Sequence, residues 1–547
     1  MGQSSEGPSL RLVSIRWERI QLVIELRSAS GAPVPDVASI RMRRRGGGRQ
    51  AEMVPTGSET DAETGTLRLR FNVMQGPGQR PLKVGRWALS ALVQGDPDAP
   101  RHAARAFEFQ ARRYHVTPSL DATGSTLVVA IDRPRRSRSV HGPARRPIPP
   151  AFLPLLRIGR RWLIQARRFP RAAFTAAVRR TTRRSGRRIV FASAGSRELS
   201  GNLRLVHDRM IDRGLDREYE LRTLLRPAPG RRSGRIRSVL RAIREQVREI
   251  RLLASADVVL VAGSLQRAVY RLRFDSDVRF IQLWHASGAF KTVGYSRIGT
   301  ASGPDPYSRV HKSYSHAIVS SVRDIPYYAE AFGIPEGRVV PTGIPRMDRF
   351  FDAEKQAEGR AAALEAFPAA QGRRTILFAP TYRGWSRAAV YDYEQIDFAA
   401  FHEIAKEQDA QIIFKMHPFV RQPVPIPAAY ADRLIDGTRT KVDVNDLLFI
   451  VDLLITDYSS LVFEYATLRR PMLFFAYDLD EYIAERDFYV PFESFVPGRI
   501  VRTSAELIDA LRRADYQADK VASFAERHFA HLDAGSTDRV IDLALGL

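Results

Sequence analysis

The chain has 547 residues, 44% of them hydrophobic, no cysteine and a formal net charge of +25. At ~150 residues per domain this length predicts three or four folded units, and the composition excludes a disordered chain. The lack of cysteine excludes a disulfide framework and a thiolate metal site. We expect no signal peptide, because the first residues lack an apolar block, and no spanning helix, because no window reaches ~20 apolar residues.

Residues 1–118 are predicted to form a small β-sandwich-like accessory domain. Short alternating runs such as RLVSIRWERIQLVIELRS and TLRLRFNV are separated by the turn-formers SGAPVPD and QGPGQRP. Several short strands at this spacing are typical of a sandwich. No combination of residues typical of a catalytic site occurs in these predicted strands, so an accessory or packing role is expected.

Residues 119–187 form an arginine-rich connector. Residues 133–188 contain 18 arginines and no acidic residue. Within this stretch a helical pattern places arginines largely opposite aromatic and aliphatic side chains, which is typical of a helix lying on an anionic membrane. The candidate membrane contacts are Arg157, Arg160, Trp162, Arg167, Arg168 and Phe169. A helix packed on its own protein with a solvated arginine face is the alternative. We expect no nucleic-acid partner, because no reading motif is present.

From residue 188 onward, predicted strands and helices alternate. The nine strand candidates cover residues 189–192, 258–262, 279–283, 317–320, 339–342, 375–379, 411–415, 453–456 and 471–475. Repeated βα units imply parallel sheets covered on both faces. We therefore predict two Rossmann-like domains at 188–340 and 341–512, followed by a helical segment at 513–547 that returns to the first. There is no GxGxxG or GxxxxGK[ST] motif, which argues against an ordinary NAD enzyme or an ATPase.

Ligands of open α/β sheets bind where strands end, so the residues after each strand are the candidates. The stretch LWHASGAFKTVG places His285 and Lys291 after one strand, and KMHP places Lys415 and His417 after another. An imidazole with a pKa near ~6.5 can take a proton at cellular pH. A lysine and a histidine leaving a strand on the same side suit an anionic group. Each histidine can equally be a satisfied structural residue.

Two further strand ends carry polar residues. The loop TYRG offers Thr381 and Arg383, whose planar guanidinium suits phosphate. In DYSSLVFEYATL, a buried strand leads into a helix whose N-terminus can bind an anion. This motif supplies Asp457, Ser459, Ser460 and, one turn into the helix, Glu464 as a candidate for a ribose hydroxyl. A surface arginine and plain helix capping are the structural alternatives.

Five ordered motifs resemble the CDP-glycerol glycerophosphotransferase family, which includes teichoic acid primases and polymerases. They are QLWHASGAFKTVGYSR, VSSVRDIPYYAEAFGIPEGRVVPTGIPRMDRFF, ILFAPTYRG, IIFKMHPF and DVNDLLFIVDLLITDYSSLVFEYATLRRPMLFF, across about residues 188–510. The resemblance implies a GT-B-like fold with an acceptor domain at 188–340 and a CDP-alditol-binding domain at 341–512. It assigns the family's two motif histidines to His285 and His417, and donor binding to Asp457, Ser459 and Ser460. It also implies a peripheral location on the cytoplasmic face of the membrane.

The resulting hypothesis is transfer of glycerol or ribitol phosphate from a CDP-alditol to a hydroxyl of a lipid-linked or polymeric acceptor, with release of CMP. His285 is the expected general base, while His417, Lys415 and Arg383 stabilise the transferring phosphoryl group. The motifs require no cofactor, and assistance by a divalent cation stays open. The alternatives are a GT-B glycosyltransferase that uses a nucleotide sugar, and a non-enzymatic protein that binds through the basic connector.

Overall fold

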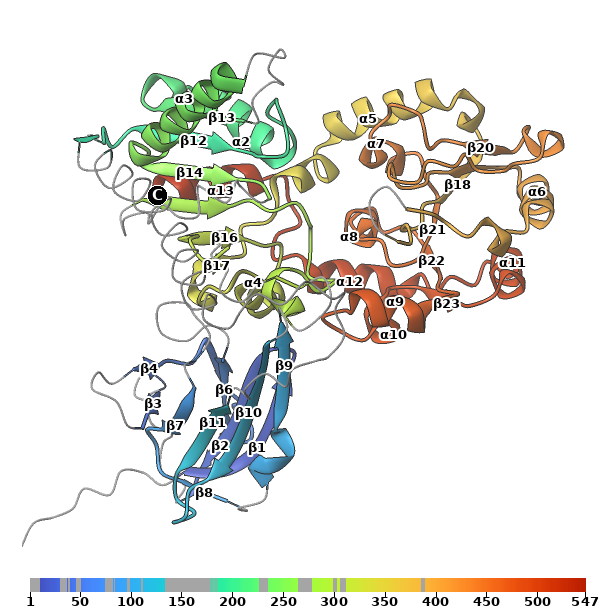
Figure 1. The fold of residues 1–547 in the computed structure, drawn as a ribbon. Coiled ribbons are helices and arrows are strands. Elements are labelled where there is room, and N and C mark those ends of the chain that lie inside the picture. Colours follow the sequence, from blue (N-terminus) through green and yellow to red (C-terminus); the bar gives the residue numbers. More distant parts are fainter. Residues whose placement is uncertain are drawn as a thin grey trace, which may run out of the picture.

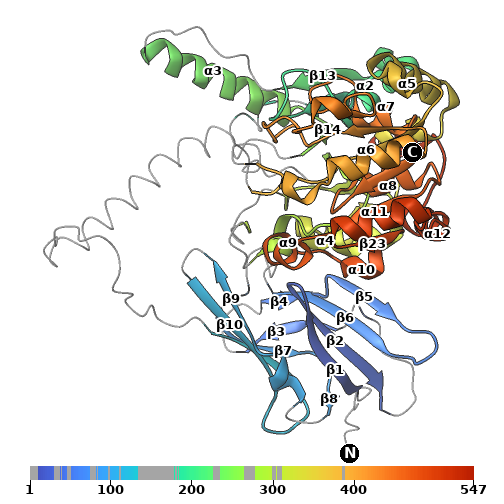
Figure 2. The ribbon, with the colours of Figure 1, turned by 90° about the vertical axis from the view of Figure 1, so that its right-hand side faces the viewer.

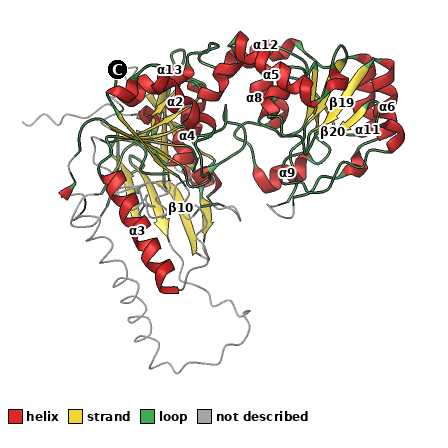
Figure 3. Cartoon of the chain, turned by 90° about the horizontal axis from the view of Figure 1, so that it is seen from above, coloured by secondary structure: helices red, strands yellow, loops and turns green. Residues whose placement is uncertain are grey.

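The computed structural model describes residues 10–29, 37, 40–45, 51–73, 82, 84–95, 99–109, 112–132, 178, 181–182, 184–225, 235–263, 278–298, 303–304, 311–384 and 389–547. Strands at the N-terminal end form a β region, residues 10–132, and two α/β domains follow side by side (Figures 1 and 3). The six candidate membrane contacts lie outside the described residues. They are Arg157, Arg160, Trp162, Arg167, Arg168 and Phe169.

The β region consists of two sheets with the strand orders β5-β6-β2-β1-β8 and β4-β3-β7-β11-β10-β9. The strands are β1 (Leu10–Glu18), β2 (Gln21–Ser28), β3 (Met42–Arg44), β4 (Glu52–Met53), β5 (Gly57–Thr60), β6 (Leu67–Asn72), β7 (Gly85–Leu89), β8 (Val93–Gln94), β9 (Arg105–Phe109), β10 (Arg112–Leu120) and β11 (Leu127–Asp132). Alternate side chains of both sheets share one apolar core that includes Ile24, Leu69 and Trp87. Since β10 and β11 belong to it, the β region continues beyond the boundary expected at residue 118.

The first α/β domain is a parallel sheet with the order β13-β12-β14-β15-β16-β17. Its strands are β12 (Arg188–Ala192), β13 (Glu220–Leu224), β14 (Val258–Val261), β15 (Arg279–Gln282), β16 (His316–Ile318) and β17 (Val339–Val340). Alternate strand residues pack on α2 (Gly201–Asp212) on one face and on α3 (Arg235–Ala254) and α4 (Ile325–Phe332) on the other. Helix α3 projects beyond the edge of the domain (Figure 2).

The second α/β domain repeats this design with the order β20-β19-β18-β21-β22-β23, again all parallel. Its strands are β18 (Arg374–Phe378), β19 (Ala410–Phe414), β20 (Leu434–Asp436), β21 (Leu453–Thr456), β22 (Met472–Phe475) and β23 (Arg499–Val501). Its helices are α5 (Ala353–Ala366), α6 (Phe398–Glu407), α7 (Val444–Leu448), α8 (Leu461–Ala466), α9 (Leu479–Arg486), α10 (Phe492–Phe495) and α11 (Ser504–Arg513). The predicted pairing of parallel, helix-covered sheets is confirmed, because their strands are buried on both faces and appear in the sequence as continuous apolar runs.

The chain ends by returning to the first domain through α12 (Asp519–His528) and α13 (Ser536–Leu545). Helix α13 lies beside α2 (Figure 1), where Arg209 pairs with Asp538 at 2.8 Å. Asp348, in the connection between the domains, accepts the backbone N–H groups of Ser536 and Thr537 at 2.9 and 2.8 Å. A carboxylate at the start of a helix offsets its positive end, so Asp348 anchors α13 where the two domains join.

Among the described residues, no helix is long and apolar enough to cross a membrane.

Candidate functional site

The site forms where a segment of the first domain crosses onto the second. Residues 290–293, called the crossing segment below, pair with the loop after α9: Tyr489 donates its N–H to the Phe290 carbonyl at 2.9 Å, and Thr292 donates to Asp487 at 3.1 Å. Lys291 lies between these bonds, opposite Phe488. Stacked rings of Phe290 and Phe488, 4.8 Å apart, fix the contact. The backbone therefore carries Lys291 into the second domain.

Two glycines beside the crossing segment allow close contacts of its backbone. A Cβ at Gly288 would collide with the ring of Phe463, which lies on α8 of the second domain. Gly294 has φ +53°, and a Cβ there would collide with the Ala331 carbonyl of α4. Only glycine adopts that backbone conformation without cost and leaves such room. Gly288 thus serves the contact between the domains, and Gly294 lets the chain turn closely against α4 of the first domain.

His285 follows β15 on a strained backbone. Trp284 has φ +47°, and Asn202 of α2 holds the turn by donating to the Leu283 and Trp284 carbonyls at 3.2 and 3.0 Å. The exposed imidazole packs on the Trp284 ring and has no hydrogen-bond partner among the described residues. Desolvation by the surrounding protein, followed by the charge of Arg346, lowers the pKa of His285 below 6.5. At neutral pH His285 is therefore neutral and free to accept a proton.

Lys291 is the centre of a group of cations drawn from both domains. Its ammonium lies 5.3 Å from the centroid of the Tyr482 ring. Burial lowers the pKa of Lys291 to about 8; the charge of Asp457 opposes this shift, and those of Arg486 and Arg383 add to it. No hydrogen bond joins its ammonium to another described residue. A largely desolvated cation of this kind is a strong partner for an anion.

His417, in the loop after β19, faces the same group. Burial lowers its pKa first, and the positive charges of Lys291 and Arg486 lower it further. Its Nδ1 accepts the N–H of Phe419 at 3.2 Å, so the neutral ring carries its proton on Nε2. The ring packs on Tyr382 at 4.6 Å, and Arg486 lies 4.9 Å from the same tyrosine. The tautomer makes His417 a hydrogen-bond donor beside two cations.

The sequence predicts that Lys415 faces an anion together with His417, but in the structure Lys415 binds other groups of the protein. Its ammonium donates to the Gly437 carbonyl at 2.8 Å, and to the carbonyl and hydroxyl of Thr440 at 3.1 and 2.8 Å. An ammonium has three protons, so none is left for a ligand. Lys415 therefore fixes the loop after β20 instead of joining the site.

Arg383 is also committed to protein partners, contrary to the expected phosphate contact. It donates to Asp457 at 2.9 Å and to both carboxylate oxygens of Asp478. Burial alone would lower the pKa of Arg383, but Asp457 and Asp478 outweigh it and raise the pKa. Four tyrosine rings surround its guanidinium: Tyr391, Tyr458, Tyr477 and Tyr482. Arg383 is a structural cation beneath the site.

The candidates of the DYSS motif divide into buried and accessible residues. Asp457 is buried and accepts the N–H and hydroxyl of Thr381 at 2.7 and 3.0 Å, so these two candidates bind each other. Ser459 accepts the N–H of Leu461 at 3.3 Å. Ser460 is exposed and its side chain makes no capping bond. The serine hydroxyls at the start of α8 are thus the accessible part of the motif.

Glu464 was a candidate for a ribose hydroxyl, and the structure contradicts this. Its side chain is 1% exposed, and its Oε1 accepts from the Ser287 hydroxyl at 2.8 Å and from Arg346. Ser287 belongs to the first domain, so Glu464 joins the two domains through the turn that carries His285. The carboxylate holds that turn and is not presented to a ligand.

Sequence reasoning missed Arg346 and Arg486. Arg346 lies in the connection between the domains and accounts for part of the lowered pKa of His285. Arg486 ends α9 and contributes to the lowered pKa values of Lys291 and His417. Arg346 comes six residues after β17 and Arg486 ends a helix, and both are single arginines in an arginine-rich chain, so no local pattern distinguishes them. Among the described residues, no three side chains of the His, Cys, Asp or Glu type gather as metal ligands.

Comparison with known proteins places this geometry in a family. The model of the CDP-glycerol:poly(glycerophosphate) glycerophosphotransferase family matches residues 173–546. The teichoic acid ribitol-phosphate polymerase TarK of Staphylococcus aureus is 42% identical over 354 residues, 64% of this chain and 67% of TarK. The teichoic acid glycerol-phosphate primase of Bacillus subtilis is 27% identical over 267 residues, 48% of this chain and 66% of the primase. The matched region thus spans about two thirds of each of these two relatives.

Among solved structures, the wall teichoic acid polymerase TagF is similar in fold. It superposes with a TM-score of 0.52 at 20% sequence identity, covering 71% of this chain and 96% of that one. At this identity the similarity concerns the fold, which is α/β and GT-B-like. The family model covers both α/β domains together with the His285 and His417 motifs. The chain therefore belongs to the CDP-glycerol:poly(glycerophosphate) glycerophosphotransferase family.

Proposed function

We propose that this protein transfers ribitol phosphate from CDP-ribitol to a hydroxyl of a lipid-linked teichoic acid polymer and releases CMP. The observation that carries the proposal is the meeting of Lys291 from the first domain with His417 and Arg486 from the second. Lys291 and Arg486 lie 5.3 and 5.9 Å from the centroid of the Tyr482 ring, and Arg486 and His417 both pack on Tyr382. Three cationic or donor groups at a domain boundary suit a diphosphate. His285 lies six positions before Lys291, on the same loop.

Each group has a role that follows from its protonation state. Neutral His285 takes the proton as the acceptor hydroxyl attacks the β-phosphorus. The P–O bond to CMP breaks, and CMP carries away the negative charge. Lys291, Arg486 and the Nε2–H of His417 offset the charge that spreads over the phosphoryl oxygens. Ser459 and Ser460 supply hydroxyl donors for the CMP phosphate.

We propose a ribitol donor rather than a glycerol donor because of the sequence identity to relatives that use each of them. Identity to the ribitol-phosphate polymerase TarK is 42%, whereas identity to the glycerol-phosphate primase is 27% over a shorter match. The residues that line a donor pocket diverge when the donor changes, so the higher identity supports a ribitol donor.

A donor panel tests the proposal. Purified protein is incubated with CDP-ribitol, CDP-glycerol or UDP-N-acetylglucosamine and a soluble acceptor mimic, and products are identified by mass. We expect CMP release and addition of ribitol phosphate to the acceptor. Faster transfer of glycerol phosphate would contradict the donor assignment. Release of UDP with transfer of the sugar would instead identify a nucleotide-sugar glycosyltransferase.

We further propose that the protein works at an anionic membrane surface, where a lipid-linked acceptor resides. The support is the sequence of the connector, in which 18 arginines and no acids occur in residues 133–188. Each arginine near such a surface contributes about 1 kcal/mol of attraction. We expect the protein to sediment with phosphatidylglycerol vesicles at low salt and not with phosphatidylcholine vesicles. Equal binding to both would contradict an electrostatic attachment.

A further inference from the structure

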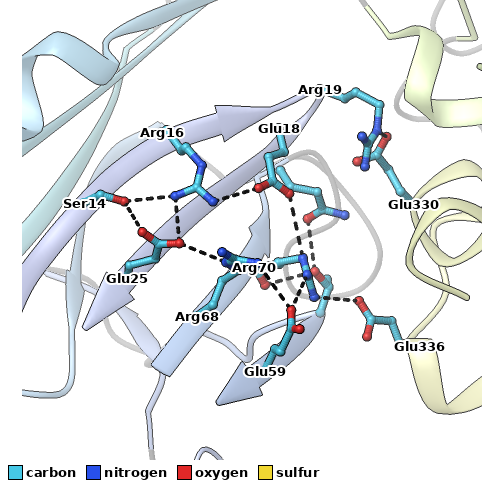
Figure 4. A network of polar contacts seen from close by, with 12 residues as sticks. Ser14, Arg16, Glu18, Arg19, Glu25, Glu59, Arg68, Arg70, Glu330 and Glu336 are labelled. Carbon is cyan, nitrogen blue, oxygen red and sulfur yellow. Dashed lines mark hydrogen bonds and ion pairs between the residues drawn. The ribbon is translucent and has the colours of Figure 1, made fainter. Parts of the chain in front are cut away.

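The turn between β1 and β2 carries an arginine from the β region into the first α/β domain. Arg19 has φ +54°, an uncommon conformation for a residue with a side chain. Its Nε donates to Glu330 of α4 at 2.9 Å (Figure 4). The side chain of Glu330 is fully buried and that of Arg19 is 19% exposed. A buried carboxylate needs such a partner, so this ion pair is a fixed point of contact.

Arg19 also contacts the second α/β domain. Its guanidinium lies 5.0 Å from the ring of Tyr327 on α4 and 5.3 Å from the ring of Tyr489. The two rings are 4.8 Å apart. Tyr489 comes from the loop after α9, so Arg19 covers a pair of tyrosines drawn from both domains. A guanidinium over aromatic faces is held by their electrostatic attraction.

Tyr489 holds the crossing segment at both ends. Its backbone N–H donates to the Phe290 carbonyl at 2.9 Å, and its hydroxyl accepts the N–H of Val293 at 3.3 Å. The same hydroxyl lies 3.0 Å from the hydroxyl of Ser296. Lys291 lies between the two anchored ends. A continuous set of contacts therefore runs from Arg19 through Tyr489 to the backbone that presents Lys291.

We propose that Arg19 is a positioning residue for donor binding: through Tyr489 it holds the crossing segment, and so Lys291, in the place where the diphosphate binds. The proposal rests on the proposed function in that Lys291 is taken to bind the donor. On this proposal the β region contributes to donor binding, although it lies outside the part of the chain that the family model matches. Arg70 adds a second contact between the β region and the first domain, 3.7 Å from Glu336 (Figure 4).

The variant must separate positioning from folding. Removing Arg19 alone leaves the buried carboxylate of Glu330 without its charged partner, which is strongly destabilising. Replacing both charged residues avoids this loss of stability. We therefore choose the double variant Arg19→Met/Glu330→Gln, together with Arg19→Lys, which keeps the charge but loses the planar fork. Arg68→Met is the matched control, because Arg68 pairs with Glu25 and Glu59 inside the same sheet.

The first measurement is hydrogen–deuterium exchange of the ligand-free protein. In the double variant, peptides covering residues 288–296 and 487–490 should exchange about tenfold faster, because local opening becomes easier there. Exchange elsewhere, and throughout Arg68→Met, should match the wild type. Unchanged exchange in these peptides, or a uniform rise across the whole chain, would overturn the proposal.

The second measurement is steady-state kinetics with CDP-ribitol. The double variant should raise KM for the donor about tenfold with a smaller change in kcat, since a displaced cation weakens donor binding. Arg19→Lys should recover part of the loss. Faster local exchange with an unchanged KM would overturn the proposal as well, while the donor panel on the wild-type protein decides the proposed function independently.

Discussion

Replacing His285 with alanine is expected to lower turnover about 10²- to 10⁴-fold while leaving donor affinity nearly unchanged. The imidazole has no hydrogen-bond partner among the described residues and a pKa held below 6.5 by desolvation and by Arg346. Its loss therefore removes a proton acceptor without breaking a network. Single-turnover kinetics with CDP-ribitol measure the chemical step, and equilibrium binding measures donor affinity.

His402→Ala is the matched control for this prediction. His402 lies on α6 at the outer edge of the second domain (Figure 1) and pairs with Asp432 at 2.9 Å. Its removal should leave turnover at the wild-type value. Near-wild-type turnover of His285→Ala would show that another group takes the proton, and a parallel loss of donor affinity would show that His285 binds the donor.

The second prediction with a large effect is that the use of the donor depends on pH through Lys291. Its pKa of about 8 means that the ammonium is charged below pH 8 and neutral above it. A neutral amine cannot offset the charge of a diphosphate, so kcat/KM for the donor should fall as the pH rises through about 8. The groups around Lys291 are Asp457, Arg383, Arg486, His417, Tyr382 and Tyr482. Burial followed by Asp457 raises the pKa of Tyr482 to about 12, so this phenol stays neutral in that range.

Two substitutions test this assignment. Lys291→Arg keeps its charge at every accessible pH, so the alkaline loss should disappear. Lys291→Met should weaken donor binding about 10- to 150-fold at pH 7, the range for a hydrogen bond to a charged group. Lys406→Met, on the exposed face of α6, is the control. An alkaline loss that persists in Lys291→Arg would assign the titration to a different group.

The sequence predicted the central strands of both α/β domains, and the strands that it missed share one property. These are β13, β20 and β23, and each lies at the edge of its sheet. An edge strand is covered less completely and carries polar side chains, as in Glu220–Leu224, where two residues are exposed. The central strands are largely apolar and stand out in the sequence, as does the apolar edge strand β17, whereas β13, β20 and β23 do not.

The sequence by itself determined which loops follow the ends of the parallel strands, because side chains at these ends must gather at one edge of a sheet, and these loops are the candidates for the site. In this way it predicted His285, Lys291 and His417. Only the tertiary structure decided which of the remaining candidates are available. Lys415, Arg383 and Glu464 are bound by groups that are distant in sequence, such as Thr440, Asp478 and Ser287. A local pattern gives the place of a side chain on its strand or loop, but its hydrogen-bond partners come from other elements, and packing alone brings these together.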